Sequence, residues 1–158
     1  GKRIERTFWT LQGTASGFAV DGSLEERSFY IRMAKELFSN YPIIGYGGNN
    51  FLTYMREIGY SHVAYCHNNY MEILSTLGII GFLVYYYEWL LIEYRLIREY
   101  RFTKSKDSLL FGMFIAIELI MDYANVSYIN IFTQFILIIS FFVIKINRNK
   151  EHINEKGD

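Results

Sequence analysis

Hydrophobic and polar positions along this chain are arranged in long blocks rather than in short repeats. Residues 126–144 hold no charged side chain, and the apolar block before them has only Glu118 and Asp122. A helix needs about 20 residues to cross the ~30 Å hydrocarbon core of a bilayer. The pattern therefore predicts three transmembrane helices, near residues 72–94, 107–125 and 126–146.

Polar and aromatic residues inside these spans limit which helix faces can contact the lipid. Glu118 and Asp122 would have to face a protein interior, a water-filled cavity or the lipid headgroups. The run Tyr85-Tyr86-Tyr87, with Trp89 beyond it, suits a membrane interface or a contact within a bundle. The alternative is a soluble three-helix bundle whose buried helices look apolar all round.

The placement of basic residues favours the membrane interpretation and gives it a direction. Residues 93–106 contain five Lys or Arg, and further Lys and Arg follow residue 144, whereas the link 122–130 has none. With both basic stretches in the cytoplasm, the three spans obey the positive-inside rule. The predicted organisation is an extracytoplasmic segment at 1–69, a membrane part at 70–146 and a cytoplasmic tail at 147–158.

Local signals in the extracytoplasmic segment predict short helices. Ser23 followed three positions later by Glu26 is a capping-box pattern, and apolar residues then recur at helical spacing. This predicts a helix near residues 24–39. Pro42 should stop it, because proline disfavours the helical conformation in the residue before it.

Glycines follow this predicted helix and indicate a tight turn. Gly45, Gly47 and Gly48 lack the preceding strand and long following helix of a dinucleotide or phosphate loop, so a turn with positive φ is the better interpretation. Asn49 or Asn50 is expected to cap a second helix over 51–58, closed by Gly59. No secondary structure is predicted for residues 1–22.

Composition excludes several classes of protein. The 158 residues carry 16 Lys+Arg and 16 Asp+Glu, with one Cys and one Pro, which excludes a basic nucleic-acid binder and a disulfide framework. A hydrophobic content of 51% excludes disorder of the whole chain. His62, Cys66 and His67 have no accompanying metal-ligand pattern, so no metal and no cofactor is predicted, and Cys66 is expected to be a small buried residue.

Four motifs occur in a specific order and spacing. They are Arg27, then Pro42-Ile43-Ile44-Gly45-Tyr46-Gly47, then His67-Asn68-Asn69-Tyr70-Met71-Glu72-Ile73-Leu74, then Gly78-Ile79-Ile80-Gly81. Together they resemble the bacterial O-antigen ligase and polymerase family, strongly over about residues 25–95. Two positions depart from the family: Ile31 stands where Trp is frequent, and Tyr70 stands where a smaller aliphatic residue is common.

The resemblance implies an all-α, multi-pass membrane protein of the bacterial cytoplasmic (inner) membrane, acting at its outer face. The implied reaction transfers a glycan from a polyprenyl-diphosphate carrier such as undecaprenyl diphosphate to a hydroxyl on a lipid-linked glycan acceptor, without metal or nucleotide sugar. The implied partners are this donor, this acceptor, the lipid bilayer and further membrane helices of the same protein. The chain starts at Gly1 without an apolar signal region, so we expect it to be a fragment of a longer protein.

The resemblance also implies roles for individual residues. Arg27 would be catalytic and bind the diphosphate, since guanidinium grips phosphate oxygens through a planar fork. His67 would be the general base, because imidazole titrates near ambient pH. Asn68 and Glu72 would assist substrate binding, Asn68 by ordering the loop or the histidine tautomer and Glu72 by pairing with an arginine.

Simpler roles remain open for these residues. Arg27 could be a solvated surface charge or the partner of Glu25 or Glu26, and His67 could cap the following helix or bond to Asn68. Gly78 and Gly81 are expected to permit close helix packing.

Two other functional classes are compatible with the sequence. A polysaccharide flippase or other transporter predicts that acids such as Glu118 and Asp122 line the spans. A non-catalytic membrane anchor predicts no convergence of Arg27 and His67. The enzyme hypothesis predicts that these two residues converge at the outer face.

Overall fold

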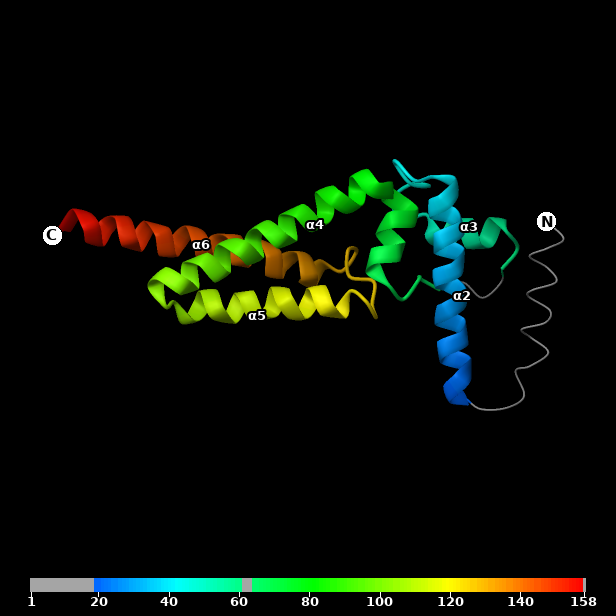
Figure 1. The fold of residues 1–158 in the computed structure, drawn as a ribbon, viewed down its shortest axis with the longest axis horizontal. Helices are drawn as coiled ribbons and strands as arrows, with labels where there is room; N and C mark the ends of the chain where they lie inside the picture. The colour runs from blue at the N-terminus through cyan, green and yellow to red at the C-terminus, as the bar shows by residue number, and fades with distance from the viewer. Residues whose placement is uncertain (1–18, 61–63, 158) are drawn as a thin grey trace.

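A computed structural model gives a helical protein in which residues 19–60 and 64–157 are described (Figure 1). Its helices are α2 (Ala19–Asn40), α3 (Phe51–Glu57), α4 (Asn69–Thr103), α5 (Lys106–Met121) and α6 (Ile131–Gly157). No strand occurs in these two ranges, which confirms the predicted all-α fold. The first 18 residues of the predicted extracytoplasmic segment, and His62, lie outside the described residues.

Two hydrophobic clusters organise the described helices. Helices α4, α5 and α6 pack side by side in a bundle, as Figure 1 shows, around a core of Trp89, Ile92, Leu96, Ile115 and Ile144. Helices α2 and α3 pack against the start of α4 around a second core, which includes Leu37, Phe51 and Met55. Residues near the start of α4 therefore lie where the two parts meet.

Helices α4 and α6 are long and apolar enough to cross a membrane. Helix α5 is 16 residues long, shorter than the ~20 residues of a typical span. Large apolar side chains such as Leu83, Val84 and Leu90 point outward from the bundle and are exposed. An extensive apolar exterior marks a membrane or protein contact surface, so it favours the membrane interpretation over the soluble bundle.

The predicted bounds agree best for the short helices, whereas the long ones differ. Helix α4 runs on to Thr103 past the predicted end at 94, and α6 begins at Ile131 rather than 126 and continues through the predicted tail. Helix α2 ends at Asn40, directly before the predicted Tyr41-Pro42 stop, and α3 occupies the predicted 51–58 region. The predicted start near residue 24 is wrong, because α2 already begins at Ala19 and Ser23 lies inside it. Asn50 is the N-cap residue of α3 but makes no side-chain capping hydrogen bond.

Helix α4 is broken at Gly78, whose φ is +66° and ψ is −171° (Figure 1). The backbone groups released by this break bond to the loop 42–47 rather than to solvent. The N–H groups of Ile79 and Ile80 donate to the carbonyls of Pro42 and Ile43, at 2.9 and 3.2 Å. In return, the carbonyls of Ser75 and Thr76 accept from Tyr46 and Gly47, at 3.0 and 2.8 Å.

Glycine is required on both sides of this contact. A Cβ on Gly78 would lie 2.3 Å from the carbonyl oxygen of Ile43, and one on Gly45 would lie 2.3 Å from the carbonyl carbon of Thr76. The positive φ predicted for the glycine turn is confirmed at Gly45 and Gly47. The close neighbour of Gly78, however, is the loop 42–47 rather than another helix, because the break exposes backbone groups that this loop satisfies.

A buried polar network joins the start of α4 to the link between α5 and α6. Asp122 is 3% exposed, and its Oδ2 accepts from Asn69 Nδ2 at 2.9 Å and from the Tyr86 hydroxyl at 2.8 Å. Its Oδ1 accepts from the Ser127 hydroxyl. Asn69 Oδ1 in turn accepts from the N–H groups of Ser127 and Tyr128, both at 3.1 Å. Of the three environments predicted for Asp122, the structure thus selects a protein interior.

Replacing Gly78 with alanine should destabilise the protein much more than replacing Gly59. Both glycines have positive φ, at +66° and +93°, but only Gly78 has backbone atoms where a Cβ would stand. We expect Gly59→Ala to cost about 1–2 kcal/mol from the left-handed conformation. Gly78→Ala should cost about 1–3 kcal/mol more, because the loop 42–47 must move. Thermal unfolding of the purified variants in one detergent measures the difference, and equal losses would contradict the backbone contact.

Removing the Tyr86 hydroxyl should weaken the polar network. We expect Tyr86→Phe to lower the free energy of unfolding by about 1–3 kcal/mol, because Asp122 and Asn69 each lose a buried hydrogen bond. Tyr87→Phe is the matched control, since Tyr87 is 65% exposed and its change should stay within about 0.5 kcal/mol. Thermal unfolding of both variants distinguishes them. A Tyr86 variant as stable as the Tyr87 variant would show that the network contributes nothing.

Candidate functional site

His67 lies in the turn that leads into α4. Its φ is +54°, a conformation uncommon for a residue with a side chain. The next residue, Asn68, is the N-cap of α4, and its Oδ1 accepts from the N–H of Met71 at 2.9 Å. The His67 ring is half-buried, and its nitrogens have no hydrogen-bond partner within the described residues. Its aromatic neighbour among these residues is Tyr30, with the two ring centroids 6.3 Å apart.

Asn68 uses both ends of its side-chain amide within the protein. Besides the capping bond from Oδ1, its Nδ2 donates to the carbonyl of Tyr123 at 3.1 Å. The residue is 5% exposed. The amide therefore orders the turn next to His67, as the sequence suggested. Both of these bonds go to backbone groups, so Asn68 does not set the orientation of the imidazole through a hydrogen bond.

Glu72 lies one turn into α4 and is completely buried. Its Oε2 accepts a hydrogen bond from the backbone N–H of Cys66 at 2.8 Å. Its Oε1 has no hydrogen-bond partner within the described residues. The carboxylate thus pairs with a backbone amide rather than with the arginine suggested by the sequence, and it holds the Tyr65–Cys66 peptide, which comes just before the Cys66–His67 peptide.

Cys66 is buried in the cluster of α2 and α3, as the sequence predicted. Burial, together with the nearby charge of Glu72, raises the pKa of its thiol far above the ordinary value. Thiolate is the reactive form of cysteine, so this thiol is inert at neutral pH. Within the described ranges no group of three or more His, Cys, Asp or Glu side chains is arranged to hold a metal ion.

Arg27 is exposed on α2 and has no ion pair within the described residues. The same helix carries Tyr30 one turn later, and the ring centroids of Tyr30 and His67 are 6.3 Å apart. Residues three apart on a helix are surface neighbours. Arg27 is therefore one helical turn from the residue that contacts His67. No ion pair joins Arg27 to Glu25 or Glu26 in the part of the chain that the structure describes.

A polar pocket of about 420 Å³ opens beside His67. One side is formed by the turn before α4, and the other by the end of α5, the α5–α6 link and the start of α6. Its lining residues are Tyr65, His67, Glu118, Met121, Asn125, Val126, Ser127, Asn130 and Thr133. Arg27 is not among them. The structure therefore brings His67 together with Glu118, a combination that the sequence did not suggest.

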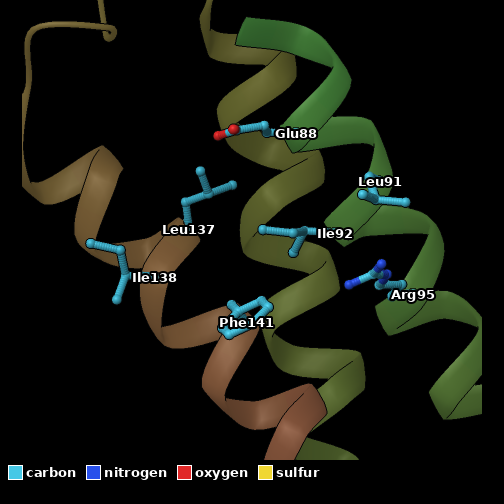
Figure 2. Close-up of a pocket in the computed structure, with 7 residues that line it drawn as sticks. All are labelled: Glu88, Leu91, Ile92, Arg95, Leu137, Ile138 and Phe141. Atoms are coloured by element: carbon cyan, nitrogen blue, oxygen red, sulfur yellow. The ribbon is translucent and has the colours of Figure 1, made fainter. Parts of the chain in front are cut away.

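A second cavity, of about 340 Å³, lies between α4 and α6 along the bundle. Figure 2 shows Leu137 and Phe141 of α6 on the side opposite Ile92 of α4, with Glu88 and Arg95 toward its two ends. None of the predicted site residues lines it. This cavity is mostly apolar and is separate from the pocket beside His67.

Two features of the site were not predicted from the sequence: the role of Asn69 and the polar pocket. Asn69 was one letter within a recognised motif, and its partner Asp122 is 53 residues away. A usable signal was present, because two consecutive asparagines before an apolar helix and an aspartate at the end of another imply buried polar groups that need partners. Pairing them requires the three-dimensional packing of α4 against α5.

Comparison with known proteins assigns the chain to a family. A family model described as O-antigen ligase matches residues 2–86, just over half of the 158-residue chain. No curated protein and no solved structure matches it. The matched region contains Arg27, the loop 42–47, His67 and the break at Gly78, and within it the loop and the break are joined by backbone hydrogen bonds. The chain belongs to the O-antigen ligase family.

Proposed function

We propose that this chain is the catalytic C-terminal part of a membrane glycosyltransferase that polymerises or ligates polyprenyl-diphosphate-linked polysaccharide of the O-antigen or capsule type. The observation that carries the proposal is the placement of His67. Its imidazole has no hydrogen-bond partner within the described residues, and its neighbour Tyr30 lies on the helix that carries Arg27. A base and a fixed cation on neighbouring elements are what this reaction needs.

The proposed reaction is a direct transfer at the anomeric carbon of the donor. A hydroxyl oxygen of the acceptor glycan attacks this carbon, and the bond from the carbon to the diphosphate oxygen breaks. The polyprenyl diphosphate leaves with the bonding electron pair, and the hydroxyl proton passes to His67. Negative charge grows on the leaving group, and the Arg27 guanidinium stabilises it through paired hydrogen bonds. Because Arg27 supplies this positive charge, the proposed transfer uses no metal.

The proposal gives Asn68 and Glu72 a part in substrate binding through the shape of the turn. Asn68 caps α4 and Glu72 holds the amide of Cys66, so both fix the backbone that carries His67. Precise placement of a catalytic group is worth a large part of a rate enhancement. Direct contact of the Asn68 or Glu72 side chain with the substrate stays a prediction.

The location of the reaction is also part of the proposal. The basic residues of 93–106 favour a cytoplasmic position for the α4–α5 turn, which puts His67 and the α5–α6 link at the outer face of the cytoplasmic membrane. The carrier diphosphate would lie at this surface. The further membrane helices implied by the family resemblance would complete the site.

A transporter predicts that acids such as Glu118 and Asp122 line the spans, and Glu118 does line the pocket beside His67. Both carboxylate oxygens of Asp122 are occupied by hydrogen bonds from Asn69, Tyr86 and Ser127. An acid held in this way is a structural group rather than a relay for cargo. A non-catalytic anchor predicts no convergence of Arg27 and His67. The Tyr30–His67 contact, which joins the helix of Arg27 to the His67 turn, supports the enzyme over the anchor.

Changing Arg27 to lysine tests the cation. Lysine keeps the positive charge but loses the planar fork, so we expect glycan transfer by the complete gene product to fall at least tenfold at normal membrane levels. Arg32→Lys is the matched control, because Arg32 is also exposed on α2. Transfer is measured as incorporation of radiolabelled donor glycan into acceptor in isolated membranes. If the Arg27 variant transfers as well as the Arg32 variant, Arg27 is a surface charge.

Changing His67 to glutamine tests the base. Glutamine keeps a similar volume and some hydrogen bonding but cannot take the proton, so we expect transfer to fall by about 10²- to 10⁴-fold. The same membranes should still bind the donor carrier lipid, because Arg27 is intact. His62→Gln is the control and should change transfer little. A His67 variant that retains most of its activity from pH 6 to pH 9 would refute the assignment of the base.

A further inference from the structure

The pocket beside His67 has the size and composition of a sugar site. Its volume of about 420 Å³ lies within the ~300–1,000 Å³ typical of small-molecule sites. His67 lines one side of it, and the groups that face His67 across it come from α5, the α5–α6 link and α6. Whatever fills this pocket therefore touches the imidazole.

The side of the pocket opposite His67 is lined by polar groups that can form hydrogen bonds with sugar hydroxyls. The Glu118 carboxylate has no hydrogen-bond partner within the described residues, and Asn125 is exposed. Asn130 accepts the N–H of Phe132 with its Oδ1, at 2.9 Å, so its side-chain amino group remains to donate. A carboxylate acceptor beside amide donors is the combination that recognises neutral polyols.

The charge of the pocket argues against a diphosphate as its occupant. Its lining includes Glu118 but no Lys or Arg. A diphosphate placed there would face a carboxylate without a counter-ion, which is unfavourable. Arg27, the cation proposed for the diphosphate, is outside this lining. The pocket beside His67 therefore suits a neutral sugar rather than the donor diphosphate.

The far wall is also held rigidly relative to His67. Asn69, two residues after His67, binds Asp122 and the N–H groups of Ser127 and Tyr128. Asn68 binds the carbonyl of Tyr123. These bonds fix the α5–α6 link to the turn that carries the imidazole, and such support is what keeps a binding site in its productive geometry.

We propose that this pocket is the acceptor subsite, which binds the sugar ring whose hydroxyl gives its proton to His67, with Glu118 and Asn125 bonding to the other hydroxyls of that ring. The inference rests on the proposed function and adds the position and the chemistry of the acceptor. Residues 118–133 lie beyond the family match at 2–86. The choice of acceptor is thus made by a segment outside the matched part of the chain.

Steady-state kinetics of the complete gene product in nanodiscs test the role of Glu118. The acceptor is the lipid-linked oligosaccharide purified from the cells that make the protein. We expect Glu118→Gln to raise the acceptor KM about tenfold or more, since bonds to a charged group are strong, while kcat and the donor KM stay within about twofold. Glu88→Gln is the matched control on α4, outside the pocket. An unchanged acceptor KM in the Glu118 variant, or an equal change in both variants, overturns the proposal.

Thiol labelling measures binding without turnover. In nanodiscs, a cysteine placed at Asn125 should react with a maleimide, whereas the native Cys66 is buried with a raised pKa and should not. We expect the acceptor oligosaccharide, cleaved from its lipid and free of diphosphate, to slow the labelling of Asn125→Cys but not that of Thr53→Cys on α3. Protection by polyprenyl diphosphate instead, or protection of both cysteines, contradicts an acceptor site.

The two levels of the hypothesis fail in different ways. If His67→Gln and Arg27→Lys lose transfer while the Glu118 variant keeps its acceptor KM and the Asn125 cysteine is not protected, only the acceptor subsite is refuted. If His67→Gln and Arg27→Lys keep full transfer, the proposed catalytic function itself is refuted. Acceptor-specific protection at Asn125 would still be a finding about binding in that case.

Discussion

The structure depends on a reciprocal set of backbone hydrogen bonds between the loop 42–47 and the break in α4. A break in a helix releases N–H and C=O groups, and burying them without partners would cost free energy for each. Here Ile79 and Ile80 donate to the loop while Ser75 and Thr76 accept from it. The exchange needs the two backbones in direct contact, which Gly45 and Gly78 permit because they carry no Cβ. These bonds attach the loop after α2 to the break in α4.

A second constraint acts at the start of α4, at Asn69, whereas the loop 42–47 holds the helix at the break. The Asp122 carboxylate receives three hydrogen bonds, and Asn69 supplies one of them while also accepting two backbone N–H groups. A buried carboxylate is tolerated only when it is bonded in this way, so the residues must be in place together. Residues 69–77 are thus held at their start by the α5–α6 link and at their end by the loop 42–47. The turn that carries His67 sits directly before this doubly fixed segment.

The sequence predicted the elements of the fold better than their junctions. The end of α2, helix α3 and the positive-φ glycines follow from local rules about proline and glycine, which depend on neighbouring residues alone. The start of α2 was missed, because a capping pattern at Ser23 does not prevent a helix from beginning earlier. The break at Gly78 was not predictable, because its stability comes from a loop more than 30 residues away. The same holds for Asn69, whose partner Asp122 is 53 residues distant.

For the site residues too, the sequence indicated the chemical type of each group but not its contacts in the fold. Resemblance to a family selected His67 and Arg27, and the structure adds that neither side chain makes a hydrogen bond or ion pair within the described residues. Glu72 shows why the sequence could not assign every role, since a carboxylate in a motif suggests a substrate contact but here bonds to the Cys66 amide. The protein therefore uses its buried polar groups to hold the turn and leaves the imidazole and the guanidinium open. A reaction that needs one base and one cation is served best when neither is consumed by the fold that positions it.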